Sequence, residues 1–102
     1  MAVLFISEYA EQARDLRGYL VAAGQEPTLA EQQVAIGGSS TQSAALNVKT
    51  AFVRVHTDAV CYVAFGTNPT ASSSQKRLAA NSTEFFGVPV GKAFKVAVIQ
   101  GV

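Results

Sequence analysis

Two adjacent apolar segments in the middle of the chain constrain the fold most strongly. Residues 51–57 (AFVRVHT) alternate, so that Val53 and Val55 share one face of an extended strand. After a turn at Thr57 and Asp58, residues 59–65 (AVCYVAF) are apolar on both faces until Gly66 ends the run. Two strands around so short a turn predict a β-hairpin, whose second strand is buried on both sides as in the centre of a sandwich or barrel.

Clusters of glycine, proline, asparagine and serine divide the rest of the chain into further short segments at near-even spacing. Such spacing favours antiparallel strands over alternating strands and helices. We therefore expect an all-β fold of about seven or eight short strands, either an antiparallel β-sandwich (jelly-roll-like) or a small barrel. Besides the central hairpin, the expected strands lie at residues 3–9, 28–36, 43–48, 75–78, 81–88 and 94–99.

The N-terminal quarter of the chain admits two interpretations. Its apolar residues recur at helical spacing after a serine that would serve as an N-cap; they are Tyr9, Ala13, Leu16 and Leu20. Gly18 interrupts that pattern, and the adjacent residues 19–21 (YLV) prefer a strand, which favours a hairpin or an extended arm. We expect a single domain over residues 1–102, in which residues 1–25 form the arm or hairpin and residues 26–102 form the sandwich core.

Charge is sparse and unevenly distributed. Charged residues make up 15% of the 102 and the net charge is +1, which argues against strong binding to nucleic acid or to anionic membranes. Residues 1–46 hold five acidic and two basic side chains, whereas residues 47–102 hold two acidic and six basic ones. This separation favours contacts between copies and a homo-oligomer; the alternative is a chance scatter of a few charges.

The start of the chain gives no targeting signal. The apolar run at residues 2–6 is short and lacks the basic start of a signal peptide. No run approaches the roughly 20 apolar residues of a membrane span. We expect synthesis in a cytoplasm, with neither membrane nor nucleic acid as a partner.

The titratable residues form no recognisable catalytic or metal-binding motif. With one histidine and one cysteine, the sequence lacks His-pair metal sites, zinc knuckles and CxxC motifs. His56, Asp58 and Cys61 are the ingredients of a cysteine nucleophile. However, Cys61 lies within an apolar strand, where a thiol packs inertly and its pKa is raised. We therefore expect no enzyme activity, no catalytic residue, no metal and no cofactor.

Three segments are candidates for protein contacts. Mixed acidic and basic side chains at residues 8–17 form either a solvated face or a surface for a basic partner. Adjacent phenylalanines at 85 and 86 face opposite ways on a strand, so that either one lies outside or both are covered. Residues 67–74 lack large apolar groups, which predicts a mobile contact loop. The candidate interface residues are Phe5, Glu8, Tyr9, Glu11, Arg14, Asn68, Pro69, Phe85 and Phe86.

Three stretches also resemble a known class of proteins. Residues 4–9 (LFISEY), 53–71 (VRVHTDAVCYVAFGTNPTA) and 80–88 (ANSTEFFGV) resemble small proteins of tailed bacteriophages and prophages, encoded among virion structural genes. The resemblance implies a virion component: a head decoration (cement) protein that binds the major capsid protein lattice and stabilises the head. A head–tail connector or a minor tail subunit is the alternative. Such proteins commonly use β-sandwich or jelly-roll domains, often as multimers, and offer no catalytic residues to transfer.

A carbohydrate-binding β-sandwich module is an alternative from another class. Sugar sites favour exposed aromatic platforms beside polar groups. The chain has no tryptophan and three tyrosines, which weakens this interpretation.

Overall fold

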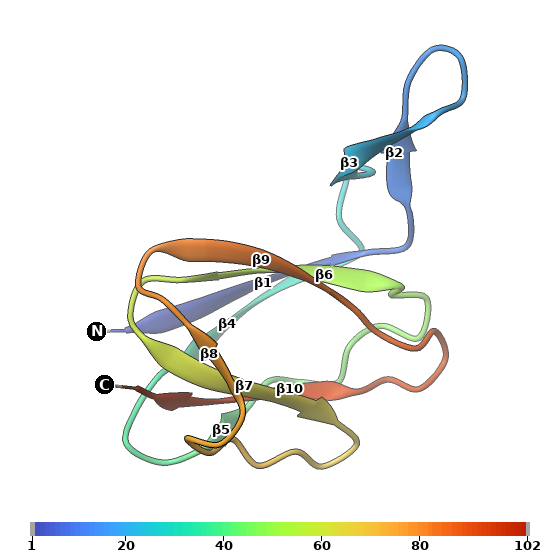
Figure 1. The fold of residues 1–102 in the computed structure, drawn as a ribbon. Helices are drawn as coiled ribbons and strands as arrows, with labels where there is room; N and C mark the ends of the chain where they lie inside the picture. The colour runs from blue at the N-terminus through green and yellow to red at the C-terminus, as the bar shows by residue number, and fades with distance from the viewer. Residues whose placement is uncertain (1, 102) are drawn as a thin grey trace.

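The computed structural model describes residues 2–101, which form two face-to-face antiparallel sheets and a projecting hairpin, with no helix in this range (Figure 1). This confirms the expected all-β sandwich, and the two sheets are separate rather than closed into a small barrel. The strands are β1 (Val3–Tyr9), β2 (Gln12–Arg14), β3 (Leu20–Gly24), β4 (Ala30–Ala35), β5 (Thr41–Gln42), β6 (Phe52–Thr57), β7 (Cys61–Gly66), β8 (Lys76–Leu78), β9 (Ser82–Gly87) and β10 (Lys95–Gln100).

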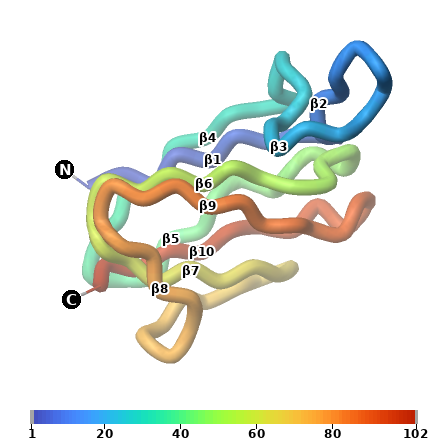
Figure 2. The backbone as a smooth tube through the Cα atoms, turned by 45° about the horizontal axis from the view of Figure 1, so that its top comes forward, coloured from blue at the N-terminus to red at the C-terminus, as the bar shows by residue number. Residues whose placement is uncertain are grey.

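The strand order is that of a long antiparallel hairpin wound into two layers (Figure 2). The first sheet has the order β4-β1-β6-β9 and the second has β5-β10-β7-β8. Four antiparallel pairs follow one another along that hairpin: β4 with β1, β5 with β10, β6 with β9 and β7 with β8. This is the pairing of a jelly roll in which β1 takes the place of the last strand. The start of β1 and the end of β10 accordingly lie at the same end of the sandwich, one in each sheet (Figure 1).

Alternating side chains of both sheets fill the core, as the sequence pattern predicted. On the first sheet, the inward residues of β1 and β6 are almost completely buried, and those of β7 and β10 meet them from the second sheet. Burying one such aliphatic side chain contributes about 1.5–3 kcal/mol. The central members of this core are Leu4, Ile6, Val53, Val55, Cys61, Val63, Val96 and Val98.

Two expectations about the central segments are wrong. Residues 51–57 and 59–65 do not pair as a hairpin, because β6 and β7 lie in different sheets. Residues 59–65 are also not buried on both faces. Cys61 and Val63 point into the core, whereas Tyr62 and Ala64 are only half-buried on the outer face. That outer face belongs to the second sheet, which no further layer of the sandwich covers.

Residues 67–74 form the expected loop, and its first part is hydrogen-bonded to the second sheet and the residue before β5. Gln42 on β5 donates to Oδ1 of Asn68 and to the carbonyl of Pro69, both at 2.8 Å. The Ala71 N–H donates to Oγ of Ser40 at 2.8 Å. Pro69 and Ala71 are buried, so small side chains and these hydrogen bonds hold this part of the loop against the sheet.

The expectation of a strand at residues 43–48 is also wrong. The Ser43 and Leu46 N–H groups bond to carbonyls beside or within β10, but a regular ladder with β10 exists only at β5. A turn then begins at Asn47, whose carbonyl accepts the N–H of Thr50 at 2.9 Å. Residues 43–48 therefore run along the sheet edge as irregular backbone.

Candidate protein-binding surface

A β-hairpin, β2–β3, leaves the first sheet at the end of β1 and projects from the side that faces away from the second sheet (Figure 1). We call residues 11–24 the arm. The molecule measures 46 × 27 × 22 Å, and the arm extends beyond the body of the sandwich. The structure thus confirms that the N-terminal segment forms a hairpin and not a helix. The arm is shorter than the expected residues 1–25, because residues 3–9 form β1, an inner strand of the first sheet.

Local turn chemistry explains why the arm tip folds as a hairpin rather than a helix. The Asp15 carboxylate accepts the N–H groups of Arg17 and Tyr19 at 2.8 and 3.0 Å, which closes the turn. Gly18 has φ +85°, a conformation that favours glycine. Nη1 of Arg14 donates to the Gly18 carbonyl at 2.8 Å and braces the turn from the opposite strand.

The root of the arm is fixed to the outer face of the first sheet by Tyr9. Its ring stacks on Phe52 with centroids 5.2 Å apart, and its hydroxyl donates to Oε2 of Glu26 at 2.7 Å. The hydrogen bond to Glu26, followed by burial, raises the pKa of Tyr9. Gly24 lies so close to the same ring that a Cβ there would overlap it. The arm therefore leaves the sheet in a defined direction.

Large apolar side chains on the arm are left in solvent. Leu16 at the turn is fully exposed, and Tyr19, Leu20 and Val21 are exposed next to it. A two-stranded hairpin is at best marginally stable in water, so an unsupported arm with an apolar tip is expected to gain stability from a partner.

The outer face of the first sheet carries aromatic residues where water would favour polar ones. The register places Phe5 beside His56 and Phe85 beside Arg54, all on the side away from the core. The ring centroids of Phe5 and His56 lie 6.2 Å apart. Phe5 is 37% exposed and Phe85 is 53% exposed. We call these four residues, together with Phe52, the outer face.

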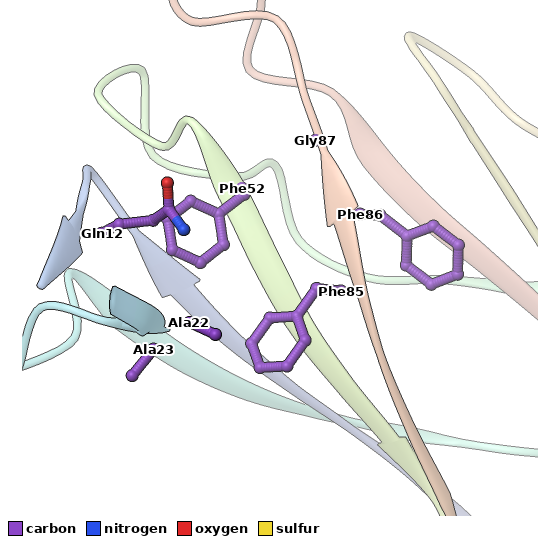
Figure 3. A pocket seen from close by; sticks show the side chains of 7 residues that line it. All are labelled: Gln12, Ala22, Ala23, Phe52, Phe85, Phe86 and Gly87. Carbon is purple, nitrogen blue, oxygen red and sulfur yellow. The ribbon is translucent and has the colours of Figure 1, made fainter. Parts of the chain in front are cut away.

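A groove of about 450 Å³ joins the arm to the outer face (Figure 3). In this view Phe52 and Phe85 lie on the same side as Ala22 of the arm, whereas the Phe86 ring points to the opposite side of β9. The Phe52 and Phe85 centroids are 6.3 Å apart. The residues that line the groove are Gln12, Ala22, Ala23, Phe52, Phe85, Phe86 and Gly87.

Of the residues that we proposed as contacts from sequence, four lie on this continuous surface. Phe5 and Phe85 are on the outer face, and Glu11 and Arg14 are exposed on the arm. The other five are the arm-root residue Tyr9, the internal Glu8, the core-facing Phe86, and Asn68 and Pro69 on the second sheet.

The expectation that Glu8 belongs to a solvated face is wrong, because three groups from two segments of the chain donate to its carboxylate. The Asn47 N–H and the Thr50 hydroxyl donate to Oε1 at 2.7 and 2.9 Å. Nε2 of Gln32 donates to Oε2 at 3.0 Å. Glu8 is 1% exposed and offers no surface to a partner.

Phe86 likewise packs inward, against Phe65 with ring centroids 5.1 Å apart. Its neighbour Phe85 is the exposed member of the pair. The strand therefore follows the alternating interpretation, in which one phenylalanine lies outside.

The structure does not bring together the three residues weighed as a nucleophilic site. Cys61 faces the core, and burial, partly opposed by a hydrogen bond with Thr57, raises the pKa of its thiol. His56 is on the outer face, with Nδ1 2.8 Å from Oγ1 of Thr83. Asp58 accepts the Val3 N–H through Oδ1 at 2.8 Å.

Within residues 2–101, no group of three or more His, Cys, Asp and Glu side chains is arranged to hold a metal ion. The same residues contain no helix of the length and hydropathy needed to cross a membrane.

Sequence reasoning missed the exposed apolar residues of the arm tip and the groove residues Phe52, Ala22 and Ala23. A usable signal was present in Asp15 and Gly18, which predict a turn and hence a hairpin. In a hairpin too far from the core to be covered, Leu16 and Tyr19 have no internal partner. Comparisons with protein-family models, with curated proteins and with solved structures find no match.

Proposed function

We propose that this protein is a structural binding protein of a tailed-bacteriophage virion, a decoration protein that attaches to the major capsid protein lattice and stabilises the head. The proposal combines the sequence resemblance with one structural observation. Aromatic side chains occupy the outer face of the first sheet, at positions that remain in solvent in the isolated chain. Exposed aromatic residues on a rigid sheet are suited to act as anchors in a protein–protein interface.

Attachment of this kind gains strength from repetition. Each copy has a modest apolar surface, and a capsid offers the same docking site at every lattice position. When several copies are linked, each further contact becomes intramolecular and the overall affinity rises without new contacts. The paired strands of the first sheet hold the side chains of the outer face in fixed positions for such contacts.

The test is co-sedimentation of the purified protein with capsids that lack it. The variant is the double substitution Phe5→Ser and His56→Ser, which removes a ring pair from the outer face without touching the core. We expect capsid occupancy to fall at least tenfold, the change that corresponds to about 1.4 kcal/mol.

The matched control changes two exposed apolar residues elsewhere, Val48→Ser and Val90→Ser, and is expected to bind as the wild type does. Full occupancy by the outer-face variant, or an equal loss in the control, contradicts the proposal. Circular dichroism of both variants checks that they remain folded.

A head–tail connector or a tail subunit would bind through the same surface, but to a different virion protein. Labelling of virions with an antibody to this protein separates these locations. Label on the head supports the capsid assignment, and label confined to the neck or tail assigns the protein to a connector or tail subunit.

The groove gives a specific reason to keep carbohydrate binding as a second candidate. Phe52 and Phe85 form an apolar wall beside the amide of Gln12, a combination that can accept the apolar face of a sugar. A glycan array decides the matter: specific hits that are lost in Phe85→Ser support it, and an array without hits removes it.

A further inference from the structure

The arm is a sheet of only two strands within residues 2–101. Three or more strands, or packing against another element, are needed for independent stability. The root of the arm has such packing at Tyr9, whereas the strands toward the tip project away from the sandwich. The distal arm therefore has unpaired strand edges and exposed apolar side chains in the same place.

Charge changes sign along the arm. The tip carries Arg14 and Arg17, and the one acid there, Asp15, already accepts two backbone N–H groups. The root carries Glu11, with Glu26 bonded to Tyr9, and Glu31 on the adjacent edge strand β4. The opposing positive charge near the root is Arg54, which faces Tyr9 from β6 together with these acids. The root is therefore acidic on balance and the tip basic.

The apolar features of the tip and the root also complement each other. The tip ends in the fully exposed Leu16, and the root borders the groove walled by Phe52 and Phe85. A tip cannot fold back into its own groove, because Tyr9 and Gly24 fix the arm pointing away from the sheet (Figure 1). The groove of a second copy is the complementary site that the chain itself provides.

We propose that two copies of this chain dimerise by laying their arms side by side in antiparallel orientation about a two-fold axis. Each basic tip then meets the acidic root of the other copy, and each Leu16 enters the other groove. Because the contact is isologous, every favourable pair forms twice. The pairing also extends the two-stranded arm into a four-stranded sheet. The dimer concerns the arm and the groove and does not depend on the proposed attachment to a shell.

The experiment measures the mass of the full-length protein by sedimentation equilibrium at high micromolar concentration. We expect twice the chain mass of 10.7 kDa for the wild type. Two charge-reversal variants test the pairing: a tip variant with Arg14→Glu and Arg17→Glu, and a root variant with Glu11→Arg and Glu31→Arg. Each variant alone places like charges together and is expected to sediment at the mass of one chain.

An equimolar mixture of the two variants restores both opposite-charge contacts, so it is expected to sediment at the mass of two chains. This recovery also shows that neither variant lost its fold. The control Lys49→Glu and Lys92→Glu reverses two exposed charges elsewhere and is expected to remain dimeric.

The proposal is overturned by a monomeric wild type, by variants that stay dimeric alone, by a mixture that stays monomeric, or by a mass that grows beyond two chains. These outcomes are independent of capsid binding. A monomer that binds capsids supports the proposed function and overturns the dimer. A dimer that does not bind capsids supports the dimer and contradicts the proposed function.

Discussion

At the scale of single residues, Glu8 shows how a charge becomes part of the core. Its neighbours along β1 are Leu4 and Ile6, which share its inward face. A bare carboxylate in such a place would be costly, but backbone and side-chain donors of Asn47, Thr50 and Gln32 satisfy it. The residue thereby ties β1 to β4 and to the turn that precedes β6.

Glu8→Gln tests this role. The amide group replaces one acceptor oxygen with a donor, so at least one of the three donors loses its partner. We expect the free energy of unfolding to fall by about 1–3 kcal/mol, measured by urea denaturation. Glu84→Gln, on an exposed side chain, is the control and is expected to change little. An unchanged free energy of unfolding in Glu8→Gln would contradict the proposal that Glu8 links β1 to β4 and to the turn before β6.

Tyr9 gives a prediction about pH. Its raised pKa means that the folded protein keeps the phenolic proton to higher pH than the unfolded chain does. The stability from its hydrogen bond to Glu26 is therefore complete below about pH 10, the ordinary tyrosine pKa, and is lost as the pH rises through the folded value. Urea denaturation at alkaline pH should show the difference between the wild type and Tyr9→Phe shrinking as pH rises; a constant difference contradicts the assignment.

At the scale of elements, the arm depends on a close approach between Gly24 and the ring of Tyr9. A methyl group at position 24 cannot fit unless the ring or the arm moves. Gly24→Ala is therefore expected to destabilise the protein by about 1–3 kcal/mol. Gly37→Ala is the matched control, because a Cβ there meets nothing within 4 Å. Thermal unfolding of the two variants distinguishes them, and equal melting temperatures would show that the root is not tightly packed.

Elements with a local apolar pattern could be predicted from sequence, and contacts with residues distant in the sequence could not. β6 matched because Val53 and Val55 alternate with polar residues, and β1 and β10 matched as short apolar runs rich in β-branched residues. The hydrogen bonds of Asn68 and Pro69 could not be predicted, because they come from Gln42, far away in the sequence. Glu8 was misjudged for the same reason, since its donors Asn47 and Thr50 lie about forty residues on.

The candidate surface was predictable to a similar degree. Phe5 and Phe85 could be placed on it from sequence, because period-two alternation separates them from core neighbours. The groove could not be predicted, since Phe52 and Ala22 lie in different sheets and come together only at the junction of the arm and the first sheet. Exposure of Leu16 and Tyr19 depends on the arm projecting past the sandwich, which no local pattern specifies.

At the scale of the whole molecule, one sheet and one hairpin carry the surface that suits binding. The core lies between the sheets, whereas the aromatic outer face, the groove and the arm lie on the far side of the first sheet. In our account this side of the molecule makes the contacts with other proteins, and its central claim is that the outer face binds the shell of the virion.

A cryo-electron microscopy map of purified virions tests this account most directly. It predicts density for the sandwich on the head at every equivalent lattice position, with Phe5 and His56 against the major capsid protein. Density in which the outer face points into solvent and another surface contacts the shell, or virions that lack the protein, would contradict it.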